Sequence, residues 1–120
     1  MALHNFYELI KYEVIDEGCK AMVHLNPNHE IYTGHFPGRP VVPGVCLLHI
    51  LKELCSKRVG SKLEISTAAS IKYLQVIDPN DSGELEWNLS ITANEEPAYI
   101  VRCSAFWKQR VCFKFVGTFQ

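Results

Sequence analysis

Apolar and polar residues alternate along most of this chain, and the alternation predicts mainly β structure. Residues 6–15 fit a strand or an amphipathic helix, but the turn residues Asp16, Glu17 and Gly18 favour a strand that ends there. Residues 21–25 alternate as the returning strand. Longer stretches rich in Ile, Val, Thr and aromatic residues follow at residues 64–76, 83–93, 97–108 and 111–119. Reversals at residues 94–97 and 108–110 predict that consecutive strands pair antiparallel.

One segment has helical spacing instead. Residues 44–57 carry apolar side chains at helical intervals and contain no proline, and Val45, Leu48, Leu51 and Cys55 are among these apolar positions. This is the only segment that predicts a helix convincingly. One apolar helix combined with an antiparallel sheet indicates the α+β class, and a length of 120 residues predicts a single domain over residues 1–120.

Composition and charge narrow the choice of partners and compartment. A formal net charge of −1 supplies no basic field for nucleic acid, and no segment is long and apolar enough to span a membrane. The N-terminus lacks the features of a signal peptide, so we expect a cytoplasmic protein. The five cysteines lack metal-binding spacing and predict reduced, mostly buried thiols. The scattered histidines predict no metal site either.

The strongest candidate for chemistry is a histidine held in a rigid loop at residues 34–45, with the sequence GHFPGRPVVPGV. Three prolines in this segment fix the backbone φ angle, and its glycines allow turns or close approaches. His35 titrates near neutral pH, so a positioned imidazole there could accept a proton and return it. The alternative interpretation is an ordinary turn in which the histidine is incidental.

The motif His35-Phe36-Pro37-Gly38, followed by Pro40-Val41-Val42-Pro43-Gly44-Val45, resembles the signature of the 3-hydroxyacyl-acyl carrier protein dehydratases. The similarity continues through the start of the helix and returns more weakly at residues 71–74 and 76–81. It implies the hotdog fold, in which a curled antiparallel sheet wraps around one central helix. It also implies a thioester substrate on acyl carrier protein, no cofactor, and a homodimer or higher assembly of dimers with the active site at the subunit interface.

The resemblance also implies roles for individual residues. His35 would be the catalytic base, with its ring oriented by the backbone carbonyl of Val41. Gly44 matches the position whose backbone N–H contacts the thioester carbonyl, at a helix start that favours negative charge. Phe36 and Val45 complete the expected substrate-binding residues.

The chain departs from the family pattern at His49, where those dehydratases carry a catalytic glutamate or aspartate on the helix. Three interpretations remain open. His49 could be a replacement acid, since an imidazolium donates a proton. Glu53, one helical turn later, could supply the carboxylate from a shifted position. Alternatively, this subunit could be catalytically impaired and act with a partner that carries the missing acid.

These interpretations lead to three functional hypotheses. The first is dehydration of a 3-hydroxyacyl thioester to the trans-2-enoyl thioester, in fatty acid or polyene-type biosynthesis. The second is a hotdog acyl thioesterase in which Glu53 activates water, and the third is an acyl-binding subunit of a dehydratase heterodimer. Basic residues near the helix end and the histidine motif would either dock an acidic carrier protein or form a solvated surface: Arg39, Lys52, Lys57, Arg58 and Lys62.

Overall fold

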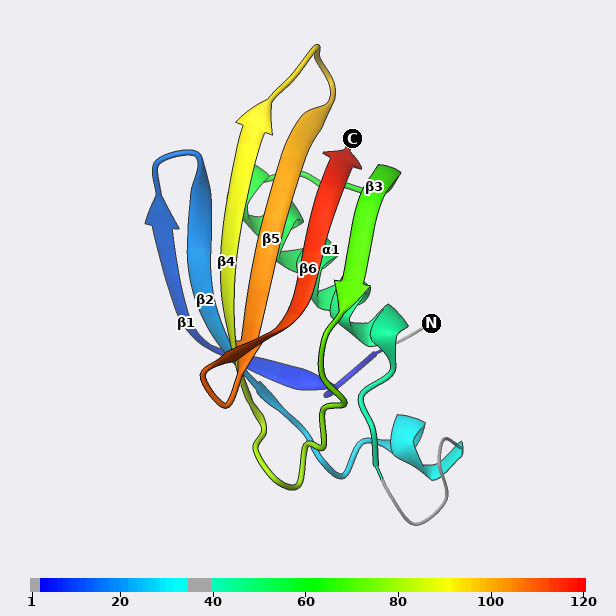
Figure 1. Cartoon of the computed structure of the whole chain (residues 1–120). Coiled ribbons are helices and arrows are strands. Elements are labelled where there is room, and N and C mark those ends of the chain that lie inside the picture. The colour runs from blue at the N-terminus through cyan, green and yellow to red at the C-terminus, as the bar shows by residue number, and fades with distance from the viewer. Residues whose placement is uncertain (1–2, 35–39) are drawn as a thin grey trace.

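A curled antiparallel sheet of six strands wraps around a central α-helix in the computed structural model, which describes residues 3–34 and 40–120 (Figure 1). The strands are β1 (Tyr7–Ile15), β2 (Gly18–Leu25), β3 (Ile65–Tyr73), β4 (Glu84–Ala93), β5 (Tyr99–Trp107) and β6 (Arg110–Phe119). The helix is α1 (Gly44–Val59), and a short 3₁₀ helix, η1, covers Glu30–Gly34. This arrangement confirms the predicted α+β hotdog architecture.

The sheet order, β1-β2-β4-β5-β6-β3, corrects one expectation about pairing. Consecutive strands pair antiparallel at β1–β2, β4–β5 and β5–β6, as predicted. Strand β3 does not pair with β4, its successor in the chain, but with β6 at the far side of the sheet. The expectation was wrong here because the connection after β3 carries the chain back across the sheet, where β4 pairs with β2. Strands β1 and β3 are therefore the two edges.

Local chemistry accounts for the ends of α1. Pro43 precedes the helix in extended conformation, with φ −64° and ψ 142°, and it cannot donate a backbone hydrogen bond. At the other end Gly60 adopts φ 87°, and its N–H donates to the carbonyl of Ser56 at 2.8 Å. Glycine adopts this left-handed conformation without a steric penalty, so it stops the helix. The helix is two residues longer than the predicted segment, which ended at residue 57.

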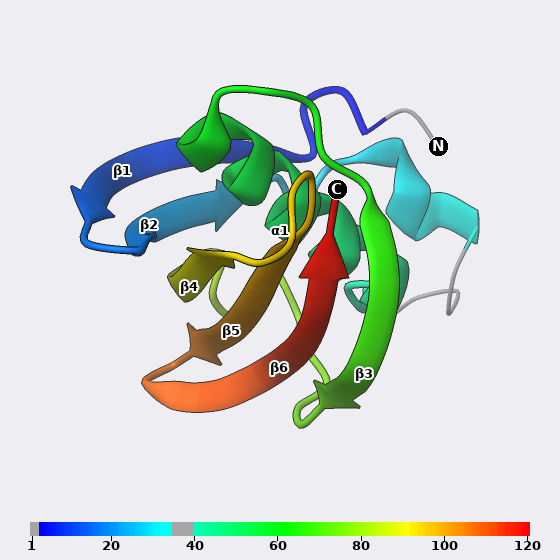
Figure 2. The same ribbon diagram turned by 90° about the horizontal axis from the view of Figure 1, so that it is seen from above.

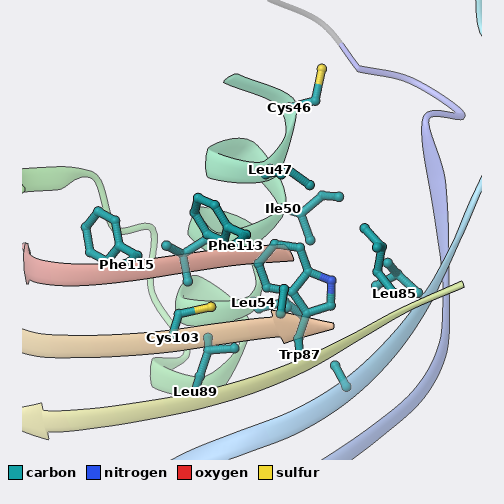
Figure 3. Packing of buried hydrophobic residues seen from close by; sticks show 14 of the residues in the cluster. Cys46, Leu47, Ile50, Leu54, Leu85, Trp87, Leu89, Cys103, Phe113 and Phe115 are labelled. Atoms are coloured by element: carbon teal, nitrogen blue, oxygen red, sulfur yellow. The ribbon is translucent and has the colours of Figure 1, made fainter. Parts of the chain in front are cut away.

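The hydrophobic core lies between the concave face of the sheet and one side of α1 (Figure 2). Alternate residues of β4 point inward, so Trp87 and Leu89 pack near Ile50 and Leu54 of the helix (Figure 3). The alternation that predicted the strands is thus the alternation between core and solvent. All five cysteines are free and buried, which confirms the prediction that the thiols are mostly buried.

The segment between β2 and the histidine motif contains a helical turn that the sequence did not predict. Residues of η1 follow a break at Asn26 and Pro27, and the N–H of Ile31 donates to Nδ1 of His29 at 3.0 Å. The buried ring of His29 also contacts the carbonyl of His4 at 2.9 Å through Nε2. His29 is therefore a structural residue that ties the N-terminal segment to this turn.

Within the described part of the chain, no helix is long and apolar enough to cross a membrane.

Candidate active site

The start of α1 provides backbone donors at the place where the sequence predicts thioester binding. The N–H of Val42 donates to the carbonyl of Ile77 at 3.0 Å, which fixes the approach to the helix. The first N–H groups of an α-helix have no partner within the helix, and no side chain of the preceding Pro43 caps them. Gly44 is partly exposed at this end, and Val45 is 51% exposed. The helix start is therefore open to a ligand with partial negative charge.

Two of the predicted site residues, His35 and Phe36, lie outside the described residues. Val41 and Gly44, on the far side of that segment, are both partly buried. Tyr32, which precedes it, is buried against Phe6, with ring centroids 6.1 Å apart. Burial, followed by the nearby Cys46 and Asp78, raises the pKa of Tyr32 far above its ordinary value. Its hydroxyl has no hydrogen-bond partner among residues 3–34 and 40–120.

The structure brings His49 and Glu53 together on the outward side of α1. His49 Nε2 lies 3.4 Å from Glu53 Oε1, and the two side chains are 25% and 47% exposed, respectively. They are one helical turn apart, so a shared face is expected. A distance of 3.4 Å is longer than an ordinary N–H···O hydrogen bond, and the contact is an ion pair only when the imidazole is protonated.

A third residue, Tyr7 of β1, completes this cluster. Its hydroxyl donates a hydrogen bond of 2.6 Å to Glu53 Oε1, the same oxygen that faces His49. Burial, then the hydrogen bond and the negative charge of Glu53, raise the pKa of Tyr7 far above its ordinary value. The phenol therefore stays protonated and acts as a donor. Tyr7 could not be identified from the sequence, since it lies 46 residues from Glu53 and no local pattern links the two residues.

A pocket of about 370 Å³ lies beside His49. Its walls come from the helix, the first residues of the chain and the region where β3 begins, and its lining consists of Leu3, Val45, Leu48, His49, Lys52, Glu64 and Ile65. Apolar side chains and the imidazole of His49 therefore line the same pocket. Two predicted site residues, Val45 and His49, share this pocket, whereas Glu53 contacts it only through His49.

Most of the basic residues near the helix end have partners inside the molecule. Lys52 lies 3.3 Å from a carboxylate oxygen of Glu64. The ammonium of Lys57 lies 5.0 Å from the ring centre of Tyr12, and Arg58 binds backbone carbonyls of the β1–β2 turn. Lys62 is 84% exposed and lies 4.0 Å from a carboxylate oxygen of Glu64, and Arg39 lies outside the described residues. These contacts favour a structural interpretation for much of the predicted basic cluster.

No group of three or more His, Cys, Asp or Glu side chains is arranged to hold a metal ion among residues 3–34 and 40–120. The thiols next to the site are also unsuited to act as nucleophiles. Burial raises the pKa of Cys46 to about 11, so this thiol stays protonated near neutral pH. The described site thus offers an imidazole, a carboxylate, a phenol and a helix N-terminus as its chemical groups.

A curled six-stranded sheet around one helix, with polar chemistry at the outward side of that helix, defines a hotdog-fold protein. A family model described as ApeI-like, ApeI dehydratase, matches residues 12–111. The chain belongs to the ApeI-like dehydratase family.

Curated relatives agree with this assignment. The 3-hydroxyacyl-acyl-carrier-protein dehydratase FabZ of Rhizorhabdus wittichii is 27% identical over 107 residues, covering 87% of this chain and 62% of the relative. The FabZ of Ligilactobacillus salivarius is 30% identical over 100 residues, covering 73% of this chain and 71% of the relative. This chain thus spans less than two thirds of the length of the Rhizorhabdus enzyme.

A solved structure, the dehydratase heterocomplex ApeI:P from Xenorhabdus doucetiae, has the same fold. It superimposes with a TM-score of 0.72 at 16% identity, and the match covers 94% of this chain and 97% of that chain. At this identity the likeness bears on the fold alone, and it agrees with the strand order and the central helix described above.

Proposed function

We propose that this protein removes water from a 3-hydroxyacyl thioester carried on acyl carrier protein and releases the trans-2-enoyl thioester, in fatty acid or polyene-type biosynthesis. Membership of the ApeI-like dehydratase family supports the reaction class. The observation that carries the proposal is the position of His49, which lines a partly apolar pocket and has a carboxylate 3.4 Å from its Nε2. This position supports His49 as a proton donor within reach of a substrate.

The proposed chemistry divides acid and base between two histidines. His35 removes the proton from C2 of the acyl chain, and the electrons of that C–H bond form the C2–C3 double bond. The C3–O bond breaks as the protonated His49 gives its proton to the departing hydroxyl, which leaves as water. Backbone N–H groups at Gly44 and Val45 stabilise the negative charge that develops on the thioester oxygen. No redox step and no cofactor is required for this elimination.

The described contacts favour His49 over Glu53 as the acid. The Glu53 carboxylate already accepts the Tyr7 hydroxyl at 2.6 Å and faces His49, so it serves the imidazole as a counter-charge. For the same reason the thioesterase alternative is less favoured, since a carboxylate that activates water would have to give up one of these contacts. The proposed substrate class follows from the relatives, which are named as dehydratases of carrier-bound 3-hydroxyacyl groups.

We further propose that the active form contains two hotdog subunits joined along β3. This edge strand and the connection after it expose large apolar side chains to solvent, namely Ile71, Tyr73, Leu74 and Val76. An edge strand with unpaired backbone groups and apolar side chains favours pairing with another chain. A second copy is the simplest occupant. A dissimilar subunit that carries an acid is the alternative, and the heterocomplex named for the Xenorhabdus structure is a precedent for it.

The test is mass spectrometry of a 3-hydroxyacyl carrier-protein thioester incubated with wild type, His35→Ala, His49→Ala or Glu53→Gln. We expect loss of one water with wild type and no loss with either histidine variant. Release of free acid in a Glu53-dependent manner would support the thioesterase instead. No change of mass with wild type over a range of chain lengths would favour an acyl-binding subunit, and adding a candidate partner would then restore turnover.

A further inference from the structure

Tyr7 is a partly buried donor that reaches from β1 to the outward side of α1, where it meets Glu53 beside the candidate acid His49. Its hydroxyl lies 2.6 Å from Glu53 Oε1, while His49 Nε2 lies 3.4 Å from the same oxygen. One carboxylate oxygen therefore accepts a phenol and faces an imidazole at once. Such an arrangement fixes where the negative charge lies relative to the ring of His49.

We propose that Tyr7 is a positioning residue for the dehydration, acting through Glu53 to hold the carboxylate charge against the imidazole of His49. The inference rests on the proposed function, because positioning of the Glu53 charge matters to the reaction only if His49 is the proton donor. Tyr7 and Glu53 do not touch the reacting atoms in this arrangement. Of Tyr7, Glu53 and His49, only His49 lines the pocket that the substrate would enter.

The physical reason lies in the freedom of the Glu53 side chain. At 47% exposure, an unrestrained glutamate would sample several rotamers, and water would weaken its attraction to His49. A hydrogen bond from a phenol to an ionised carboxylate is stronger than one between neutral groups, and it reduces the rotamer freedom of the Glu53 side chain. Burial and the charge of Glu53 raise the pKa of Tyr7 far above its ordinary value, so the phenol keeps its proton throughout the working pH range.

The charged side chains near His49 and Glu53 pair with each other rather than with these two residues. Lys52, next to Glu53 in sequence, lies 3.3 Å from a carboxylate oxygen of Glu64, so its charge has a partner of its own. The remaining wall of the pocket around His49 consists of Leu3, Val45, Leu48 and Ile65, which are apolar. Glu53 is therefore the carboxylate that the structure assigns to His49 among the described residues.

The experiment measures kcat and KM for dehydration of a 3-hydroxyacyl carrier-protein thioester by wild type, Tyr7→Phe, Glu53→Gln and the double variant. We expect Tyr7→Phe to lower kcat about tenfold with KM within about twofold, because loss of a hydrogen bond to a charged group is worth about one such factor. In the Glu53→Gln background the same substitution should have no further effect, because the two residues act as one unit.

Tyr12→Phe is the matched control. Tyr12 lies on the same strand, and its ring faces Lys57 rather than Glu53. The kcat of the Tyr12→Phe variant should therefore equal that of wild type. A melting temperature of Tyr7→Phe within a few degrees of wild type separates positioning from a loss of folding. An unchanged kcat in Tyr7→Phe, or effects that simply add, would overturn the inference while the proposed function stands.

A second readout does not depend on turnover. The ultraviolet absorbance of the Tyr7 phenolate, obtained as the difference between wild type and Tyr7→Phe, should appear at lower pH in Glu53→Gln than in the native background. The direction follows from removing the carboxylate that raises the pKa of Tyr7. If this ionisation does not depend on Glu53, the contact and the inference both fail. A wild type without dehydratase activity in any assembly would overturn the proposed function and the positioning role with it.

Discussion

The ring of Tyr73 lies directly against Gly44, where α1 begins. A Cβ added to Gly44 would lie 2.7 Å from Cζ and 2.9 Å from Cε1 of that ring. Tyr73 stands at the end of β3, and its ring also packs on Phe113, with centroids 5.6 Å apart. The glycine is therefore needed for close packing here, since a larger residue would push Tyr73 away from the helix start.

Gly44→Ala should destabilise the protein by about 1 kcal/mol, because the methyl group forces the Tyr73 ring to move. In a Tyr73→Ala background the same substitution should stabilise by up to about 1 kcal/mol, because alanine favours the helix over glycine. Urea unfolding of the four proteins measures both changes. If Gly44→Ala changes the free energy of unfolding by the same amount and in the same direction in both backgrounds, the contact with Tyr73 is not the reason for glycine at this position.

Arg58 holds the β1–β2 turn against α1. Its Nε donates to the carbonyl of Gly18 at 2.7 Å and its Nη2 to that of Ile15 at 3.2 Å. Arg58→Lys should lower the free energy of unfolding by about 1–2 kcal/mol, because an ammonium cannot reproduce the planar fork of donors. The control is Lys57→Arg at the adjacent exposed position, which should change stability by less than about 0.5 kcal/mol in the same urea titration. Equal effects at the two positions would contradict the role given to Arg58.

The buried thiols predict a loss of stability at alkaline pH. Burial, and then the neighbouring Cys19, raise the pKa of Cys55 to about 12, and burial raises that of Cys112 to about 11, against an ordinary value of 9.0. Above about pH 9 the unfolded chain loses these protons while the folded chain keeps them. The free energy of unfolding therefore falls as pH rises, by at most about 1.4 kcal/mol per pH unit for each thiol.

Urea unfolding between pH 7 and pH 10, in the presence of a phosphine reductant, checks this slope. We expect a clear decrease above pH 9 in the wild type and a smaller decrease in Cys55→Ala, compared at matched pH. Equal slopes in the two proteins would show that Cys55 is not responsible. Cys46→Ala should reduce the slope by a similar amount, since burial raises the pKa of Cys46 to about 11, above the titrated range.

The strands and the helix could be predicted from the sequence because each follows from a local pattern. Alternation marks β4 and β5, whose inward residues meet the helix, and proline and glycine bracket α1. The place of β3 could not be predicted in this way. An alternating pattern shows that a segment is a strand, but it does not tell which strand pairs with it, and β6 is more than 30 residues away in the chain.

The candidate site shows the same division. The motif predicted the helix start at Gly44, and helical spacing placed His49 and Glu53 on one face, where they lie 3.4 Å apart. Tyr7 could not be found by spacing, because its contact with Glu53 depends on how β1 crosses the helix. A glutamate on a partly covered helix face and a tyrosine on a distant strand occur together in many proteins. Their presence in a sequence therefore does not identify a contact such as that between Glu53 and Tyr7.

The two exposed edges of the sheet allow a matched test of the proposed assembly. Val76, just beyond β3, is 66% exposed, and Val14, on the opposite edge strand β1, is 59% exposed. Val76→Glu places a charge in the segment that also exposes Ile71, Tyr73 and Leu74, and it should convert a dimer to monomers, because burying an unpaired carboxylate at an interface is costly. Val14→Glu should leave the assembly intact. Sedimentation velocity at micromolar concentration distinguishes the two, and dissociation by Val14→Glu alone would move the interface to β1.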